Sequence, residues 1–255
     1  MSANTDRTAS NSSGDMIIEV LKVVLQALAI AFVVRLFFFQ PFSIPSGSME
    51  NTLLVGDYIF VSKYSYGYSR YSFWPLEYFP PHGRILSGEP QRGDVIVFRY
   101  PSDTSKDYIK RLVGLPGDQI QMMEGVLYIN GTPVPKVRVA DYVESNWQGM
   151  PHGVPRYEET LPNGVKYFVL DRDPHGSLDT TGVFTVPPGS YFMMGDNRDN
   201  SSDSRDPNGG VGYVPAENLI GRAQVIFFSC DGCTVWRPWE WPVRIRWSRF
   251  FKLVY

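Results

Sequence analysis

Ser48 lies in a short turn whose residues could present a nucleophile. It belongs to the run PSGSM (45–49) and follows Gly47, whose lack of a side chain permits tight backbone geometry and close approach of a substrate. A serine hydroxyl is a weak nucleophile and needs a neighbouring base to take its proton. Each of the three histidines lies in a stretch rich in proline or glycine. The base is therefore sought among other residue types.

Lys110 is the candidate base. A lysine can take the serine proton when burial keeps it neutral, and Ser-Lys pairs are an established variant of the catalytic triad. Lys110 stands in the run DYIKRLV (107–113), where aromatic and aliphatic neighbours would desolvate it. Arg111 is excluded because arginine does not deprotonate in proteins. A surface lysine that alternates with an inward Ile109 along a strand remains the alternative interpretation.

An apolar segment at 16–39 precedes the serine turn and would place it beside a membrane. A membrane-spanning helix needs about 20 apolar residues, and this segment is apolar except for Glu19, Lys22, Gln26 and Arg35. A core helix of a soluble protein and a cleavable signal peptide are the alternatives. The segment ends in three phenylalanines and lacks the small residues of a cleavage site, so we expect an uncleaved anchor. The polar segment 1–15 is expected to be a disordered tail.

The rest of the chain predicts a mainly β domain. It has 255 residues, 43% of them hydrophobic, with 20 prolines and 23 glycines between segments rich in aromatic and β-branched residues. We expect a catalytic domain over 40–229 with a β insert at about 131–188, and an Asn130-Gly131 hairpin turn. The loop 64–93 contains aromatics that we expect to be exposed. Strands are expected at 57–63, 94–100, 108–114, 191–194 and 220–228.

Charge and cysteine usage limit the other functions. A formal net charge of −2 gives no reason to expect nucleic-acid binding. Cys230 and Cys233 lack the second cysteine pair of a zinc site, and their context favours two free thiols while leaving a disulfide open. The final segment, 230–255, is rich in tryptophan and arginine, a composition typical of a membrane interface. A packed terminal strand or a protein-binding tail is equally compatible with it.

Four segments, in this order, resemble the type I signal peptidases (leader peptidases), the bacterial Ser-Lys membrane endopeptidases. They are QPFSIPSGSM (40–49), RGDVIVF (92–98), YIKRLVGLPGD (108–118) and MGDNRDNSSDSR (194–205). Any one of them alone would be weakly specific, but the ordered set is very specific. The resemblance extends from about Val33 to Phe228.

The resemblance implies a fold and an activity. It implies a β-rich catalytic domain, tethered by one helix, that removes signal peptides from exported preproteins after Ala-x-Ala-like sites through an acyl-enzyme. It implies signal peptides and the lipid bilayer as partners, and neither a metal nor an organic cofactor. It places the protein in the bacterial inner (cytoplasmic) membrane, with a single span, the tail in the cytoplasm and the catalytic domain on the periplasmic side. The oligomeric state is left open.

The resemblance also assigns roles to residues of this sequence. Ser48 would be the nucleophile and Lys110 the general base, with Ser46 in the oxyanion hole and Ser201 orienting the lysine. Asp203 and Arg205 would pair and hold the loop near the site. The substrate-binding residues would be Met49, Leu53, Tyr108 and Ile109 at the first pocket and Phe42, Ile44, Ile59 and Val97 at the third.

The chain departs from the family pattern just after the nucleophile. Relatives usually carry proline before Thr-Leu, whereas this chain has Glu50 and Asn51 before Thr52. We expect Asn51 to loosen the turn and Glu50 to point to solvent. Three rival functions stay open: a self-cleaving repressor, which would need a DNA-binding module in place of the anchor, a specialised processing peptidase, and an inactive membrane-tethered binding protein.

Overall fold

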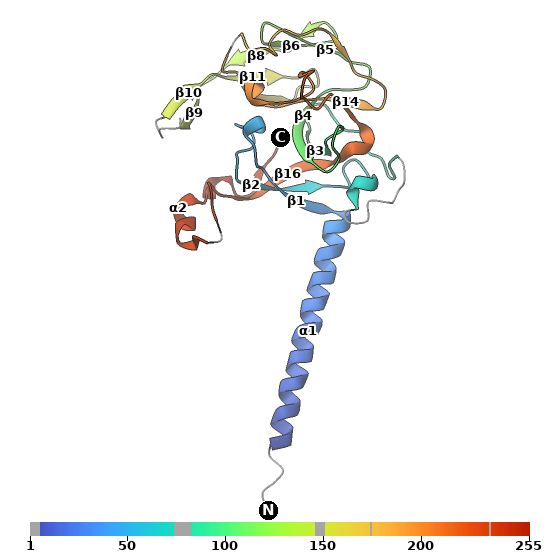
Figure 1. Cartoon of the computed structure of the whole chain (residues 1–255), viewed down its shortest axis with the longest axis vertical. Coiled ribbons are helices and arrows are strands. Elements are labelled where there is room, and N and C mark those ends of the chain that lie inside the picture. Colours follow the sequence, from blue (N-terminus) through green and yellow to red (C-terminus); the bar gives the residue numbers. More distant parts are fainter. Residues whose placement is uncertain (1–5, 74–82, 146–150, 174, 235) are drawn as a thin grey trace, which may run out of the picture.

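A long helix stands out from a β-rich domain. The computed structural model describes residues 6–73, 83–145, 151–173, 175–234 and 236–255. Helix α1 (Asp6–Phe37) carries one interval, Gly14–Phe37, that is long and apolar enough to cross a membrane and is not buried in the domain. The helix projects away from the β-rich domain (Figure 1). The helix begins at Asp6, within the polar segment 1–15. A helix, once nucleated, gains a hydrogen bond for each residue added.

The main sheet is antiparallel and has the order β1-β2-β16-β3-β4-β14-β15, with β17 paired to β16. Its strands are β1 (Phe39–Ser43), β2 (Asp57–Ser62), β3 (Val95–Arg99), β4 (Asp107–Gly114), β14 (Ser190–Met194), β15 (Tyr213–Pro215), β16 (Leu219–Ser229) and β17 (Lys252–Leu253). The predicted mainly β fold is confirmed, and the five predicted strands correspond to β2, β3, β4, β14 and β16.

Smaller sheets lie on the side of the domain away from α1 (Figure 1). They are ordered β13-β5-β6-β7 and β12-β11-β8, and β9 and β10 form a separate hairpin. Their strands are β5 (Gln119–Met123), β6 (Val126–Ile129), β7 (Thr132–Pro133), β8 (Lys136–Arg138), β9 (Tyr142–Ser145), β10 (Pro151–Val154), β11 (Arg156–Thr160), β12 (Lys166–Leu170) and β13 (Phe184–Thr185). Asn130 and Gly131 connect β6 to β7 with positive φ at both positions, as a two-residue hairpin turn requires.

One hydrophobic cluster lies beneath the serine turn. It contains residues from the turn, from β2, β3 and β16, and from the chain's end. Its buried members are Ile44, Met49, Leu53, Ile59, Val61, Val95, Val97, Ile220, Ala223, Ile226 and Val254. The turn is therefore supported from below by the main sheet.

The end of α1 is held by the loop that follows β2. The Lys63 side chain is almost fully buried, and its Nζ donates to the Arg35 and Leu36 carbonyl oxygens at 3.2 and 3.4 Å, and to that of Ser72. The Tyr68 hydroxyl donates to the Phe37 carbonyl at 2.6 Å. Burial, followed by the charge of Arg35, lowers the pKa of Lys63 to about 8. A cation at the last turn also complements the helix dipole.

Aromatic side chains in this loop are more buried than expected. Tyr66, Tyr71 and Phe73 are each at most 9% exposed, so the expectation of exposed aromatics is wrong for them. Tyr66 belongs to a hydrophobic cluster, and Phe73 packs edge-on against the ring of Phe37. These rings bury the loop against the end of the helix and against the sheet.

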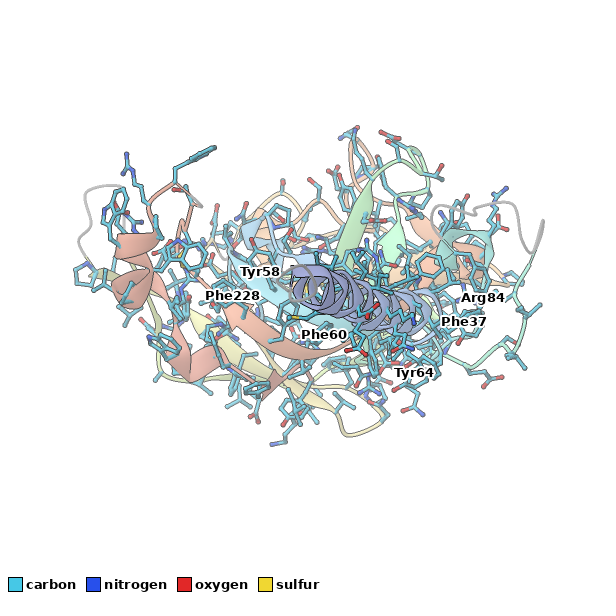
Figure 2. All side chains as sticks on the ribbon, turned by 90° about the horizontal axis from the view of Figure 1, so that it is seen from below. Phe37, Tyr58, Phe60, Tyr64, Arg84 and Phe228 are labelled. Atoms are coloured by element: carbon cyan, nitrogen blue, oxygen red, sulfur yellow. A yellow bond between two sulfur atoms is a disulfide. The ribbon has the colours of Figure 1, made fainter. Side chains whose placement is uncertain are left out.

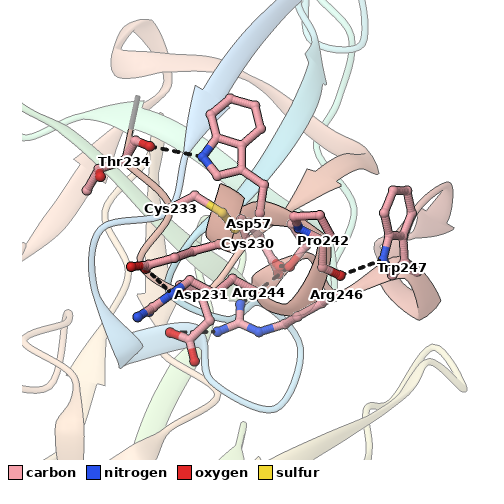
Figure 3. Close-up of a disulfide and its surroundings, with 12 residues drawn as sticks. Asp57, Cys230, Asp231, Cys233, Thr234, Pro242, Arg244, Arg246 and Trp247 are labelled. Carbon is pink, nitrogen blue, oxygen red and sulfur yellow. Dashed lines mark hydrogen bonds and ion pairs between the residues drawn. A yellow bond between two sulfur atoms is a disulfide. The ribbon is translucent and has the colours of Figure 1, made fainter. Parts of the chain in front are cut away.

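The C-terminal segment packs onto the main sheet. Cys230 and Cys233 form a disulfide, so the free thiols that local context favoured are not found (Figure 3). The antiparallel bridge between Cys230 and Ile245 returns the chain toward β16 and places Ile245 beside the start of the segment. Arg249 Nε then donates to Asp57 Oδ1 at 2.9 Å, and β17 pairs with β16. Of the alternatives left open for this segment, the structure shows a packed terminal strand, while Trp236, Trp239 and Trp247 remain exposed.

Candidate active site

The serine turn is a single turn of 3-10 helix. Gly47–Met49 form it, closed by a hydrogen bond from the Glu50 N–H to the Gly47 carbonyl at 3.0 Å. Ser48 is 8% exposed. Ser46 caps the turn in extended conformation, makes no capping hydrogen bond through its side chain, and is exposed. The first N–H groups of a helix have no partner inside it, so this turn directs N–H groups outward beside the serine.

Lys110 reaches Ser48 from strand β4. Its Nζ lies 2.6 Å from Ser48 Oγ and 3.2 Å from the Ile109 carbonyl oxygen, and the residue is 3% exposed. Burial lowers the pKa of Lys110 to about 8, against the opposing carboxylates of Asp203 and Asp196. Desolvation disfavours the charged ammonium, so a large fraction of this lysine is neutral just above neutral pH. The two residues predicted as nucleophile and base are thus in contact.

A third segment, after β14, packs against the serine turn. Asn197 N–H donates to the Ser48 carbonyl at 3.1 Å, and Asn197 Nδ2 donates to the Gly47 carbonyl at 3.0 Å. A Cβ added to Gly195 would lie 2.2 Å from Ser201 Oγ and 2.6 Å from the Ser48 carbonyl oxygen. Glycine is therefore required for the two serine-bearing segments to approach each other.

Ser201 is buried at this contact but does not make the expected bond to the lysine. Its Oγ has no hydrogen-bond partner among the described residues. Asp203 and Arg205 do pair, with Nη2 and Oδ2 2.9 Å apart and both side chains at most 1% exposed, so this is not a solvated surface pair. Asp203 Oδ2 also accepts from the Gly195 N–H at 3.0 Å. The pair thereby ties its own loop to the glycine.

Two further ion pairs support the site. Arg111 donates from Nε to Asp196 Oδ1 at 2.8 Å and from Nη2 to Asp196 Oδ2 at 2.7 Å, which joins β4 to the third segment. Arg198 pairs with Glu159 of β11, and both are at most 2% exposed. The motifs alone gave no reason to connect Glu159 with the site, because it lies in the insert.

The site opens into a continuous groove. The part around Ser48 and Lys110, which we call the catalytic groove, has a volume of about 550 Å³. Its lining residues are Pro45, Ser46, Ser48, Lys106, Asp107, Tyr108, Ile109, Lys110, Asn200 and Ser202. The adjoining groove, of about 330 Å³, is lined by Pro41, Phe42, Ser43, Ile44, Pro45, Val97, Asp107, Tyr108 and Ile109. Both share Pro45 and the stretch 107–109, so one extended chain could occupy them together.

The predicted substrate-binding residues divide into two groups. Phe42, Ile44, Val97, Tyr108 and Ile109 line the groove. Met49, Leu53 and Ile59 do not line it and are 0% exposed, in the hydrophobic cluster beneath the turn. The sequence shows large apolar residues in both cases and does not distinguish the wall of a groove from the core behind it.

Glu50 and Asn51 differ from expectation. Glu50 is half-buried rather than directed to solvent, and burial, followed by the charge of Glu144, raises its pKa. Its Oε2 lies 3.5 Å from Asn197 Nδ2 and 4.0 Å from Arg172 Nη2. Asn51 has a φ of +81°, a left-handed conformation that asparagine tolerates and proline cannot adopt. The turn is therefore built differently from a proline-containing turn.

The carboxylates of Asp171, Asp179 and Asp199 lie within 4.8 Å of one another, the spacing of a possible metal site. None of them lines the groove, and Lys136 already forms an ion pair with Asp171. They are therefore not assigned to the chemistry of Ser48.

The chain is similar to known proteins over most of its length. The family described as "Signal peptidase, peptidase S26" matches residues 17–228. Signal peptidase I of Rickettsia typhi is 44% identical over 248 residues, which cover 89% of this chain and 90% of that protein. Signal peptidase I of Rickettsia massiliae is 40% identical, with 99% of this chain and 96% of that protein covered.

Among solved structures, a signal peptidase I from Enterococcus faecalis V583 is 29% identical, with a TM-score of 0.31. It covers 52% of this chain, and 96% of its own length is matched. The family match spans the apolar helix, the serine turn, the lysine strand and the third segment. The chain belongs to the signal peptidase family, peptidase S26.

Proposed function

We propose that this protein is a signal peptidase I that uses Ser48 and Lys110 as a catalytic dyad. The observation that carries the proposal is the 2.6 Å contact between Lys110 Nζ and Ser48 Oγ, made by a lysine whose burial lowers its pKa to about 8. A general base must be within hydrogen-bond distance of the proton that it takes and must have a pKa near the working pH. Lys110 meets both conditions.

The reaction proceeds through an acyl-enzyme. Neutral Lys110 takes the Ser48 proton as Oγ attacks the substrate carbonyl, and the resulting ammonium gives that proton to the leaving amine. Water then enters, Lys110 takes a proton from it, and hydrolysis of the ester returns Ser48 to its free form. The Ser48 N–H and the Ser46 hydroxyl hold the oxyanion, and losing such a donor typically costs about 2.7–4 kcal/mol of transition-state stabilisation. Ser201 is buried beside Gly195 without a bond to Lys110, so the contacts that position the lysine here are those of its Nζ with Ser48 Oγ and the Ile109 carbonyl oxygen.

The groove accounts for the cleavage site. The residues before the scissile bond lie extended along the adjoining groove, beside strand β1, an edge strand of the main sheet that can pair with an added strand. Large side chains such as Phe42, Ile44 and Tyr108 narrow this groove, which favours small substrate side chains and hence Ala-x-Ala-like sequences.

The membrane sets the position of the domain. Helix α1 is a single span, with the catalytic domain on the periplasmic side of the inner membrane. Tyr58, Phe60, Tyr64 and Phe228 are seen on the domain face from which α1 emerges (Figure 2). Aromatic side chains are favoured at the interface between lipid and water, as are the exposed tryptophans of the C-terminal segment.

Trapping the acyl-enzyme tests the proposal. A preprotein with an Ala-x-Ala site is mixed with the full-length protein in detergent, quenched in acid within the first turnover, and analysed by intact mass and peptide mapping. We expect an adduct with the mass of the signal peptide on Ser48. Cleavage without an adduct, or an adduct on another residue, would refute the mechanism, and no cleavage at all would favour the inactive binding protein.

A further inference from the structure

A second cleft lies where α1 enters the domain. This helix cleft has a volume of about 520 Å³ and is lined by Ala31, Val34, Arg35, Phe39, Pro41, Phe60 and Val225. The volume falls within the roughly 300–1,000 Å³ typical of clefts that hold a ligand. One wall is a face of α1, because positions 31, 34 and 35 are three and four residues apart. The other wall is formed by β1, β2 and β16.

Both walls are held in place. Lys63 and Tyr68 bind the carbonyl oxygens of the last turn of α1, immediately after the residues that line the cleft. On the other side, Pro41 is paired with Phe60 in the sheet register. Because both ends of the helix–sheet junction are fixed by hydrogen bonds, the cleft is preformed.

The helix cleft and the adjoining groove meet at Pro41 on the edge strand β1, with Phe60 and Val225 of the cleft on the opposite face of the sheet from Phe42 of the groove. Pro41 lines both the helix cleft and the adjoining groove, and the adjoining groove shares Tyr108 and Ile109 with the catalytic groove. The order from Ser48 outward is therefore catalytic groove, adjoining groove, helix cleft. A chain that passes from Ser48 along β1 arrives at the flank of the membrane helix.

We propose that the helix cleft binds the end of the apolar region of a signal peptide. The inference rests on the proposed function. Signal peptides carry an apolar region of roughly 7–15 residues shortly before the small residues of the cleavage site. With those small residues in the adjoining groove, the preceding apolar residues fall at the cleft, whose lining is apolar apart from Arg35. The cleft thus selects a substrate by its apolar segment, in addition to its cleavage site.

Photo-crosslinking tests the contact. Benzoylphenylalanine is introduced at Val34, or at the adjacent Val33, which is turned by one residue around the helix and does not line the cleft. Each full-length protein carries Ser48→Ala and is reconstituted into phospholipid vesicles with a preprotein. We expect an adduct between position 34 and the apolar region, several-fold stronger than at position 33 and suppressed by excess unlabelled preprotein.

The other outcomes are distinguishable with a third photoreactive residue at Pro45, in the catalytic groove. Two outcomes would overturn the inference and leave the proposed function standing. In the first, the preprotein forms equal adducts with positions 33 and 34. In the second, position 34 forms adducts with lipid alone while the photoreactive residue at Pro45 captures the cleavage site. Absence of preprotein adducts at all three positions, together with no cleavage by the unmodified protein, would overturn both.

A filling substitution provides a kinetic test. Val34→Trp should lower kcat/KM for the preprotein about tenfold, the equivalent of losing the burial of one apolar side chain. It should leave a short soluble peptide with the same cleavage site unaffected, and Val33→Trp should change neither substrate. An equal loss on both substrates would mean that Val34→Trp disturbs the fold, and no loss on either would contradict the cleft's role.

Discussion

The chemistry of the site depends on where one lysine is buried. Lys110 and Arg111 are adjacent on β4, yet their environments give them different tasks. Arg111 is matched by the Asp196 carboxylate and stays charged, whereas Lys110 faces Ser48 without a carboxylate in direct contact among the described residues. A strand alternates its side chains, so neighbouring residues can meet opposite environments. One is therefore structural and the other can deprotonate.

Activity should rise with pH through the pKa of Lys110. The charged form cannot accept the serine proton, so kcat/KM on a soluble peptide should increase about tenfold per pH unit below about 8 and level off above it. Lys63→Met is the control, since burial lowers the pKa of Lys63 to about 8 as well. The rise should persist in that variant. A rise centred near the ordinary lysine pKa, or one lost with Lys63, would contradict the assignment.

Gly195 should not tolerate a side chain. In Gly195→Ala the new Cβ would press on Ser201 and on the Ser48 carbonyl, and displacing the nucleophile by about 1 Å can cost about 100-fold in rate. The matched variant is Gly182→Ala, where no atom lies within 4 Å of the added Cβ. The rate of peptide cleavage by the two variants measures this loss of activity, and their unfolding curves check that both are folded. Full activity in Gly195→Ala would show that this close approach is not needed.

The contact between Ser48 and Lys110 could be predicted from the sequence because the motifs that carry these two residues are specific. The burial of Met49, Leu53 and Ile59 in the core could not be predicted from the sequence, because an apolar side chain has the same sequence pattern in a groove wall and in the core. The disulfide was only the less favoured alternative, since the sequence around a C-x-x-C pair does not show whether the fold brings the two sulfurs together. The left-handed turn at Asn51 would have required knowledge of its φ angle.

At the scale of elements, the insert supports the active site. Strand β11 contributes Glu159, which pairs with Arg198 of the short 3-10 helix η3 (Arg198–Asn200). This helix lies between Asn197, whose N–H binds the Ser48 carbonyl oxygen, and Ser201. Sequence analysis expected the strands of the insert but not this contact, which joins residues far apart in the chain. Periodicity predicts elements, whereas their packing partners follow from topology.

Glu159→Gln should destabilise the protein strongly. Removing one partner of a buried pair typically costs about 3–5 kcal/mol, because the other charge is left buried. The neighbouring Glu158→Gln removes only a surface pair with Lys166, which should cost at most about 1 kcal/mol. Urea unfolding of the two variants in detergent, followed by tryptophan fluorescence, compares them. Similar small losses would mean that the insert is not anchored through Glu159.

At the scale of the whole molecule, the hydrogen bonds between the end of α1 and the loop after β2 determine how the groove is oriented relative to the helix. Lys63 is buried there and has no role in the chemistry, so its buried charge is explained by the carbonyl oxygens that it binds. The anchor and the β domain were both predicted from sequence. The hydrogen bonds from Lys63 and Tyr68 to the end of α1 were not predicted, because the loop that makes them has no periodic pattern.

Lys63→Met should separate two activities. Without the lysine the Arg35 and Leu36 carbonyl oxygens lose their donor, and of the described side chains only that of Tyr68 still hydrogen-bonds to the end of α1. Cleavage of a preprotein in vesicles should therefore fall several-fold while cleavage of a soluble peptide is kept. Lys166→Met, a change at an exposed lysine, should affect neither. If both substrates are cleaved as by the unchanged protein, these hydrogen bonds do not orient the groove.

The most direct test of the account is a cleavage assay of the full-length protein in lipid-containing detergent, with a preprotein bearing an Ala-x-Ala site and mass spectrometry of the products. Ser48→Ala, Lys110→Ala and Lys110→Arg are measured in parallel, the last keeping a positive charge that cannot deprotonate. The account predicts one cut after the second alanine by the unchanged protein and none by the three variants. Cleavage that survives in either Lys110 variant would contradict it, because Ser48 would then have another base.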